Sequence, residues 1–207
     1  MLRLEGMSMD DSRALREAVA CLARGEVIAF PTETFYGLAA DALSGEAVSR
    51  LVALKGRPAG KAIPCIVGDQ AQVPLLCAEW PAWAQRLAER FWPGPLTLVV
   101  PAHAELPGPL RPEGTVGLRL SSHPLARALA LGLGRPITST SANFSGGPEV
   151  ARAADLAPGL RAQLAFVLDG GPTPGGRGST VVRFDAGRLR CLRDGAIPFG
   201  DVERELR

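Results

Sequence analysis

Three cationic side chains, Lys55, Arg57 and Lys61, lie within one short segment that also holds two glycines and a proline. Lys55 and Lys61 are the only lysines in a chain with 23 lysine and arginine residues. Cations on a Gly-rich loop suit a polyphosphate, because lysine supplies a point charge, arginine a forked donor, and glycine lets backbone N–H groups approach closely. A second interpretation stays open, in which a helix ends here with Lys55 favoured by the helix dipole and Gly56 as the C-cap. Walker-type spacing is absent.

Polar side chains also follow the short apolar run of residues 27–30, which reads as a buried strand. Thr32, Glu33 and Thr34 come directly after it, where open α/β sheets usually bind ligands. The carboxylate of Glu33 is suited to act as a base or to bind a metal ion through water. A structural role, in capping a helix or ordering the loop, is also open. The single tyrosine, Tyr36, is expected to shape a pocket rather than transfer a proton, since nothing adjacent lowers its pKa.

Two further segments carry polar groups suited to binding. Thr115 and Arg119 fall on one face of an alternating strand pattern, so their side chains point the same way. Residues 136–147 are rich in hydroxyl side chains and include Asn143. This run fits either a polar surface loop with capping serines or a lining of neutral hydrogen-bonding groups for a ribose, base or phosphate.

The overall composition limits the class of protein. The length of 207 residues suits one α/β domain, and the net charge of +2 is too small to indicate nucleic-acid binding. The four cysteines, at 21, 65, 77 and 191, are scattered among apolar neighbours and read as reduced core residues of a cytosolic protein. With two histidines and no Cys/His grouping, a protein-ligated zinc site is not expected. Neither a signal peptide nor a membrane span is recognisable, so we expect a soluble, cytoplasmic protein.

Hydrophobic periodicity and turn residues predict the elements that position these groups. Helices are expected after Ser8 up to Gly25, after the N-cap Ser44 up to the lysine segment, and over residues 81–90, 124–131 and 153–164. Strands are expected over 27–30, 62–67, 96–100, 115–120, 166–168, 179–184 and 188–193, the last two as a hairpin. Thr34 and Lys61 would share one rim if their strands are neighbours. Trp92 is expected to cover the hydrophobic core. Residues 170–178 are a possible mobile lid, and the charged tail after Pro198 is expected to be exposed.

Taken together, these segments resemble the YrdC/Sua5 family, also called TsaC, of L-threonylcarbamoyladenylate synthases. The matching segments are 31–34 (PTET) with 36–38 (YGL), 55–58 (KGRP), 91–97 (FWPGPLT), 141–143 (SAN) with 145–146 (SG), and 179–182 (STVV). Each is weak alone, but they occur in the family's order over roughly residues 20 to 195. The chain looks like the single-domain form, residues 1–207 with a motif-bearing core of about 12–197, without the extra C-terminal Sua5 domain.

The resemblance implies an α/β fold in which a twisted, mostly parallel mixed sheet and flanking helices surround a concave, positively lined site. It implies that threonine, bicarbonate or CO2, and ATP give threonylcarbamoyl-AMP and pyrophosphate, with Mg2+ carried largely by the nucleotide and no dedicated metal ligands in the protein. Other proteins would use the product to form N6-threonylcarbamoyladenosine on tRNA.

The resemblance also implies roles for individual residues. Four positions match those that hold threonine: Thr34, Arg119, Ser141 and Ser179. Five match ATP-contacting positions: Arg57, Lys61, Thr115, Asn143 and Arg193. Lys55 and Arg57 are the candidate catalytic cations near the phosphates. Arg119 can pair with the amino acid's carboxylate through two parallel hydrogen bonds.

The chain departs from the family pattern at three places. Many relatives carry histidine at the position of Ile66, an acidic residue at that of Arg183, and proline at that of Asp194. Two other functions remain open. One is a module that makes carbamoyl-adenylate from carbamoyl phosphate, as in hydrogenase maturation proteins; the other is a double-stranded RNA or tRNA-binding module, whose binding would be steeply salt-dependent.

Overall fold

A computed structural model of the chain describes residues 9–56 and 60–207. Its strands form two mixed sheets, and both contribute to one cavity. The four-stranded sheet has the order β7 (Thr140–Ser141), β2 (Tyr36–Ala39), β1 (Ile28–Pro31) and β8 (Phe166–Val167). Within it β1 runs antiparallel to β2 and parallel to β8, while β2 and β7 are antiparallel.

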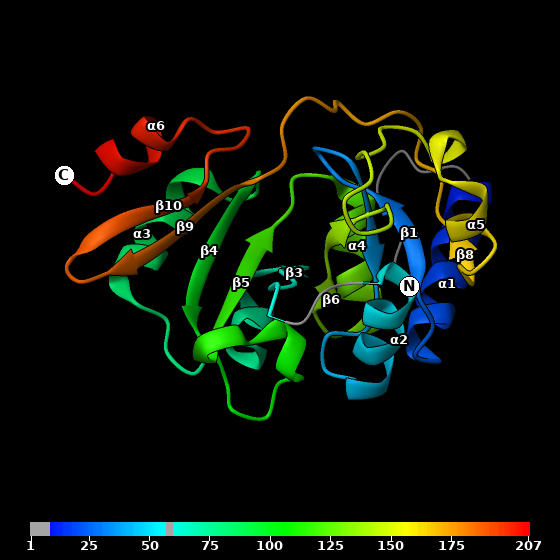
Figure 1. Cartoon of the computed structure of the whole chain (residues 1–207), viewed down its shortest axis with the longest axis horizontal. Helices are drawn as coiled ribbons and strands as arrows, with labels where there is room; N and C mark the ends of the chain where they lie inside the picture. The colour runs from blue at the N-terminus through cyan, green and yellow to red at the C-terminus, as the bar shows by residue number, and fades with distance from the viewer. Residues whose placement is uncertain (1–8, 57–59) are drawn as a thin grey trace.

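The second sheet has six strands, in the order β10 (Arg188–Arg193), β9 (Thr180–Asp185), β4 (Leu96–Pro101), β5 (Thr115–Leu120), β3 (Cys65–Val67) and β6 (Ile137–Thr138). Parallel pairing joins β4 to β9 and β3 to β5, and the other neighbours are antiparallel. Figure 1 shows this sheet on the left and the four-stranded sheet on the right. The connection from β8 to β9, residues 168–179, runs along the top from one sheet to the other.

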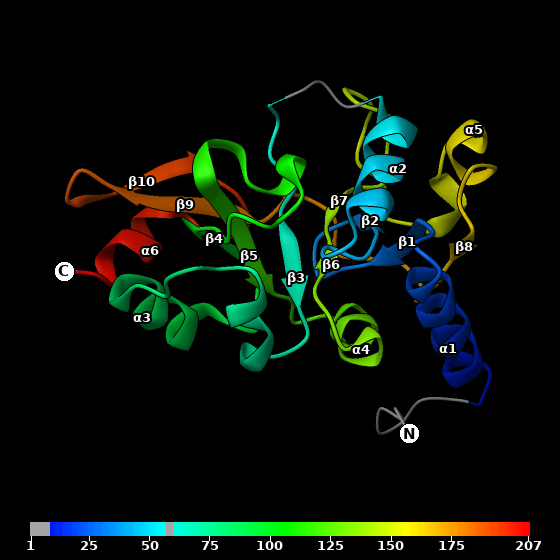
Figure 2. The same ribbon diagram turned by 90° about the horizontal axis from the view of Figure 1, so that it is seen from below.

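Helices cover the sheets from both ends. The α-helices are α1 (Met9–Ala23), α2 (Gly45–Lys55), α3 (Ala82–Phe91), α4 (Pro124–Leu133), α5 (Pro158–Arg161) and α6 (Phe199–Arg204). Short 3-10 segments are η1 (Gln70–Leu75), η2 (Gly108–Leu110), η3 (Pro112–Gly114) and η4 (Ala153–Asp155). In Figures 1 and 2, α3 and α6 lie side by side next to the six-stranded sheet, whereas α1 and α4 pack beside β1 and β8.

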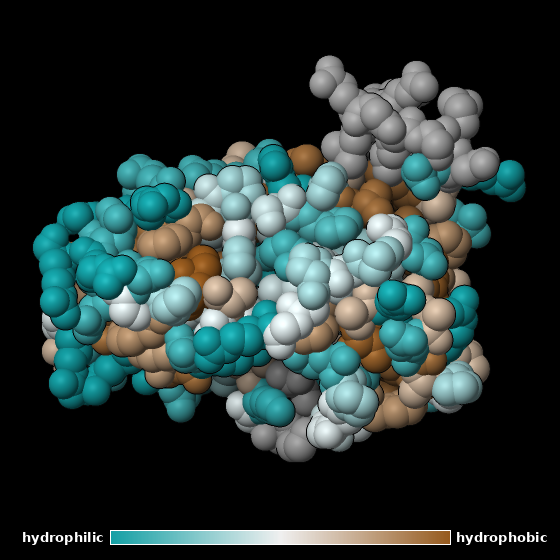
Figure 3. Space-filling model, turned by 90° about the horizontal axis from the view of Figure 1, so that it is seen from above, coloured by the Kyte–Doolittle hydropathy of each residue, from teal (hydrophilic) through white to brown (hydrophobic). Residues whose placement is uncertain are grey.

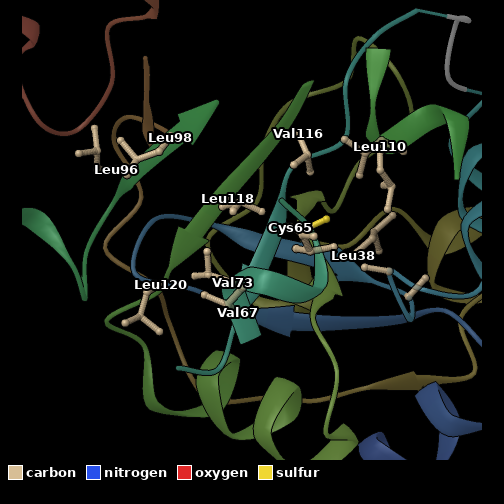
Figure 4. Close-up of a cluster of buried hydrophobic side chains, with 14 of the residues drawn as sticks. Leu38, Cys65, Val67, Val73, Leu96, Leu98, Leu110, Val116, Leu118 and Leu120 are labelled. Carbon is tan, nitrogen blue, oxygen red and sulfur yellow. The ribbon is translucent and has the colours of Figure 1, made fainter. Parts of the chain in front are cut away.

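Alternation along β4 and β5 separates the core from the cavity. Leu98 and Leu118 face each other across these strands and join Cys65 and Leu38 in the main hydrophobic cluster, which Figure 4 shows. Their neighbours Thr97 and the glycine and arginine of β5 face the opposite way, into the cavity. A second cluster lies between α1, α4 and β1. The face seen from above in Figure 3 is mainly hydrophilic, with only small hydrophobic patches.

Most predicted elements are confirmed. Ser44 caps α2 by accepting a hydrogen bond from Ala47 N at 3.2 Å, and Gly56 ends the helix with a φ of 56°. The interpretation of Lys55 and Gly56 as a helix C-terminus is therefore confirmed. Trp92 is buried, as expected of a core lid, and its indole N–H donates to Leu96 O at 2.7 Å. The β9–β10 hairpin is also confirmed.

The α/β fold class with mixed sheets and flanking helices is confirmed, whereas other expectations are wrong. The described strands form two sheets rather than one, and their antiparallel pairs outnumber the parallel ones. Residues 36–39 form β2 rather than a loop, and β1 and β3 lie in different sheets. The tail after Pro198 is exposed at Asp201 and Arg204, as expected, but it forms α6 and buries Val202 against the core. Cys191 is exposed, because β10 is an edge strand with one side uncovered. In the described part of the chain, no helix combines the length and the apolar character needed to span a membrane.

Candidate active site

The two sheets together line a cavity of about 530 Å3. Its walls come from the β1–β2 turn, the segment before β3, the β6–β7 stretch and the cavity face of the six-stranded sheet. The polar side chains in the lining are Thr32, Thr34, Tyr36, Lys61, Thr97, Glu113, Thr115, Arg119, Ser139, Thr140, Ser141, Glu149, Ser179, Arg183 and Arg193. Four of these are cations, so the cavity suits a ligand with several negative charges.

The register of the strands arranges the cavity floor in rows. Continuing the β4–β5 pairing one residue beyond Leu98 and Leu118 places Arg119 next to Thr97, which in turn is opposite Val181. The next row holds Gly117, Val99 and Arg183. A Cβ atom at Gly117 would lie 3.2 Å from Thr97 Cγ2, so the glycine leaves a hollow that a side chain would crowd. The floor thus has a polar row beside a second row in which Gly117 and Val99 leave room next to Arg183.

Arg119 is held rigidly at one end of the polar row. Its Nη1 lies 2.7 Å from Glu33 Oε1, and Nη2 donates to Ser139 Oγ at 3.2 Å. The side chains of Arg119 and Glu33 are 7% and 11% exposed. The second carboxylate oxygen of Glu33 accepts a hydrogen bond from Ser121. Glu33 therefore orients Arg119, a structural role other than the helix capping or loop ordering that was predicted. Several guanidinium N–H donors of Arg119 are left for a ligand.

A second guanidinium, that of Arg193, faces the same cavity from β10. Arg193 donates from Nη2 to Ser179 Oγ and from Nε to Ser179 O, both at 2.8 Å. Burial lowers the pKa of Arg193; the negative charge of Glu149 opposes this shift and the positive charge of Arg119 adds to it. The mutual effect of the two arginines means that an anion between them relieves repulsion.

Hydroxyl groups also line the cavity that the two arginines face. Ser179 Oγ lies 2.9 Å from Thr97 Oγ1, and Thr34 Oγ1 lies 3.1 Å from Thr32 Oγ1. The structure thus brings together in the cavity lining all four residues predicted to hold threonine, Thr34, Arg119, Ser141 and Ser179.

The five residues predicted to contact ATP do not all line the cavity. Lys61, Thr115 and Arg193 line the cavity, and Arg57 lies outside the described residues. Asn143 does not line it. Its amide oxygen accepts from Ser141 Oγ at 2.8 Å, and its amide nitrogen donates to Gly147 O, so the side chain orders its own loop.

Lys55 also lies beneath that loop rather than in the cavity lining. Its ammonium group donates to Ser141 O, and to Asn143 O and Oδ1 at 2.7 and 3.0 Å. The residue is 2% exposed. Three acceptors match the three protons of an ammonium group, so Lys55 ties the end of α2 to the Ser141–Asn143 segment.

Tyr36 behaves as a structural anchor. The single proton of its hydroxyl is shared between Gly171 O at 2.7 Å and Asp169 Oδ1 at 3.0 Å, and the hydroxyl oxygen accepts from Gly170 N at 3.2 Å. Burial, followed by the effect of Asp169, raises its pKa to about 12. The connection it anchors is further pinned at Thr173, whose N–H donates to Ala151 O at 2.8 Å. Hydrogen bonds at several points thus hold the segment that was predicted as a possible lid.

Several polar residues of the cavity lining were not predicted as site residues: Thr97, Glu113, Ser139, Thr140, Glu149 and Arg183. The position of Thr97, a polar residue inside an otherwise apolar strand, was a usable signal. Ser139 lay inside the hydroxyl-rich run, whereas nothing local distinguishes Glu149 or Arg183. Ile66, one of the departures from the family pattern, is paired with Arg119 but is fully buried in the second hydrophobic cluster and does not line the cavity.

Two remaining features bear on the chemistry. Among residues 9–56 and 60–207, no group of three or more His, Cys, Asp or Glu side chains is placed to hold a metal ion. The carboxylates of Glu113 and Glu149 line the cavity. Burial lowers the pKa of His123, which lies close enough to Glu33 for the carboxylate to oppose the shift.

Comparison with known proteins gives consistent matches. The Sua5/YciO/YrdC family model, described as "Telomere recombination", matches residues 20–195. The threonylcarbamoyl-AMP synthase of Bacillus subtilis (strain 168) is 39% identical over 191 residues, which are 91% of this chain and 55% of that protein. The enzyme of the same name from Vibrio cholerae is 39% identical over 184 residues, covering 87% of this chain and 97% of the relative.

A solved structure is similarly close. The structure of P. abyssi Sua5 complexed with L-threonine superposes with a TM-score of 0.91 at 36% identity, over 97% of this chain and 59% of that one. The chain thus spans a little over half the length of the B. subtilis and P. abyssi relatives.

Proposed function

The chain belongs to the Sua5/YciO/YrdC family, and we propose that it forms threonylcarbamoyl-AMP and pyrophosphate from L-threonine, bicarbonate or CO2, and ATP. The observation that carries this proposal is Arg119, fixed on the cavity floor by Glu33 and Ser139 and surrounded by hydroxyl groups. A buried, oriented guanidinium recognises a carboxylate, and a relative was solved with L-threonine bound. We infer that the product serves N6-threonylcarbamoyladenosine formation on tRNA.

In the proposed reaction the threonine amine adds to the carbon of CO2 and loses a proton, which gives a carbamate. A carbamate oxygen then attacks the α-phosphorus of ATP, and the bond to the β-phosphate oxygen breaks as pyrophosphate leaves. The protein needs no nucleophile of its own for these steps. Its contribution is to hold the two reactants in line and to stabilise the charge that develops on the phosphates.

The cavity residues fit these tasks. Arg119 holds the carboxylate of threonine, and the hydroxyls of Thr34 and Ser179 address its amine and side chain. Lys61 and Arg193 face the nucleotide phosphates, and Arg57 is proposed to join them. Tyr36 stays protonated, since its pKa is raised to about 12, and acts as a support. Glu33 is committed to Arg119 and Ser121 rather than serving as a base.

Mg2+ is proposed to enter with ATP, with the nucleotide phosphates as its main ligands. Hard cations of this kind keep several water ligands and need few carboxylates from a protein, which suits a lining that holds Glu113 and Glu149. When bound, Mg2+ neutralises phosphate charge.

The test is pyrophosphate release from ATP and Mg2+, with threonine and bicarbonate added singly and together. We expect release only when both are present. Release that depends on carbamoyl phosphate instead would replace this proposal with the carbamoyl-adenylate reaction. If folded protein releases no pyrophosphate under any combination but binds duplex RNA with a steep salt dependence, the RNA-binding alternative takes its place.

A further inference from the structure

The proposed reaction leaves one cation of the cavity lining, Arg183, without a role. Arg183 on β9 lies directly opposite Arg190 on β10. Directly opposed side chains of an antiparallel pair lie close together, and like charges there destabilise the sheet. Such a pair is favourable only where negative charge compensates it.

Arg183 is built into the cavity but incompletely partnered. Its side chain lines the cavity and is 31% exposed. Nη1 lies 3.1 Å from Glu113 Oε2, and Nη2 lies 3.8 Å from Asp185 Oδ2. Its Nε is buried and meets no acceptor among the described residues. A buried N–H that lacks an acceptor costs free energy, so a ligand oxygen at this position is favoured.

The present partner of Arg183 is held weakly. The side chain of Glu113 is 78% exposed, and such ion pairs contribute little because water screens them. The backbone of Glu113 has a φ of 54°, a conformation that residues other than glycine rarely adopt. Glu113 is therefore a carboxylate at the cavity mouth that a stronger anion can displace.

We propose that Arg183, assisted by Arg190, forms a phosphate subsite of the cavity, which Glu113 occupies when the cavity is empty. Its ligand is a polyphosphate: the terminal phosphates of ATP or the pyrophosphate that leaves. The row of Arg183 and the row of Arg119 and Thr97 are two residues apart along the strands, which is about 7 Å. A chain of phosphate groups can cross this distance. The forked guanidinium matches phosphate oxygens. This inference rests on the proposed function, because it requires a nucleotide in this cavity.

Calorimetric titration of the whole chain tests the subsite with three probes: pyrophosphate, a non-hydrolysable ATP analogue and AMP. Arg183→Ala is expected to weaken pyrophosphate binding about tenfold or more, with AMP unaffected. If the subsite takes the terminal phosphates of ATP, the analogue weakens in parallel; if it serves only the released product, pyrophosphate alone weakens. Arg183→Lys keeps the positive charge but lacks the forked donor, so its pyrophosphate affinity is expected to lie between those of Arg183→Ala and the unmodified protein.

Two further variants sharpen the result. Glu113→Gln is expected to tighten pyrophosphate binding by about two- to fivefold, because the competing carboxylate is gone. Arg188→Ala is the matched control, since it removes the same charge from the same hairpin at an exposed position outside the cavity lining. It is expected to leave all three affinities unchanged.

Equal pyrophosphate affinity in Arg183→Ala and the unmodified protein overturns the subsite. An equal loss of affinity in Arg188→Ala overturns it too, because the effect would then come from the overall positive charge of the hairpin and not from a contact at Arg183. Unmodified protein that binds no pyrophosphate, or an Arg183→Ala defect confined to duplex RNA, also overturns it. The turnover assay distinguishes failure of the subsite from failure of the proposed function. If pyrophosphate release still depends on threonine and bicarbonate, the proposed function stands even when the subsite proposal fails.

Discussion

The role of Arg119 makes the sharpest prediction. Arg119→Lys keeps the positive charge but replaces a fork of five donors with one nitrogen. Arginine reaches Glu33 at 2.7 Å and Ser139 at 3.2 Å and still offers donors to a ligand. A lysine that holds Glu33 forfeits at least one charge-assisted hydrogen bond to the threonine carboxylate. That bond contributes about 1.5–3 kcal/mol, so kcat/KM for threonine should fall about 10- to 150-fold.

The assay is the initial rate of pyrophosphate release at varied threonine, with ATP and bicarbonate saturating. The KM for ATP should stay within about threefold, since Arg119 is assigned to the amino acid. Arg135→Lys is the control, because Arg135 forms an ion pair of the same length, with Nη1 2.7 Å from Asp41 Oδ2, although it is more exposed and lies away from the cavity. If Arg119→Lys keeps full kcat/KM for threonine in a normally folded protein, Arg119 does not hold the carboxylate.

Three more predictions follow from side chains around the cavity. Lys55→Met should destabilise the fold by about 2–3 kcal/mol, because three acceptors lose their donor. Lys61→Met should instead mainly raise the KM for ATP, since Lys61 lines the cavity. Equal melting midpoints of the two variants would contradict this distinction. Tyr36→Phe should cost about 1–2 kcal/mol in thermal unfolding yet leave the pH–rate profile unchanged up to about pH 10, since the pKa of the phenol is raised to about 12; loss of an alkaline limb would refute its structural role. Burial lowers the pKa of His123, so its contribution to stability is complete above the unfolded value of about 6.5 and disappears as the pH falls through the folded value. His123→Asn keeps an N-cap side chain but removes this titration, so its melting midpoint should fall less than that of the unmodified protein between about pH 7 and 5, and parallel curves would refute the assignment.

Alternation was the most informative signal for the site. The pattern of residues 115–120 predicted that Thr115 and Arg119 share a face, and both line the cavity. Cation clustering was less informative. Lys55 stands beside the other two cations in the sequence, yet as the last residue of α2 it turns toward backbone carbonyls of residues 141 and 143. The direction of a side chain at a helix terminus depends on what packs there, which local sequence does not specify.

The strand β2 was not predicted, because the apolar run that indicates β1 ends at residue 30 and is followed by polar residues. Pro31 instead pairs with Tyr36, and the turn between them is closed by Thr32. The Thr32 hydroxyl donates to Phe35 O at 2.7 Å, and its backbone N–H reaches the same oxygen at 3.2 Å. A threonine that closes a turn in this way leaves only a weak sequence signal beside a proline, because the turn also depends on the pairing of the flanking strands.

The presence of two sheets depends on one short segment, the hydroxyl-rich run. Thr138 belongs to β6 of the six-stranded sheet, and its hydroxyl accepts from Ala40 N, next to β2, at 2.8 Å. Two residues later the chain enters β7 and pairs with β2 in the other sheet. Ser139, between the two, donates its N–H to Pro64 O at 2.8 Å and accepts from Arg119. The predicted alternatives, a structural loop or a ligand lining, are therefore not exclusive: the residues that join the two sheets also orient the arginine assigned to the substrate, so a mutation that loosens this junction should impair threonine binding before it unfolds the protein.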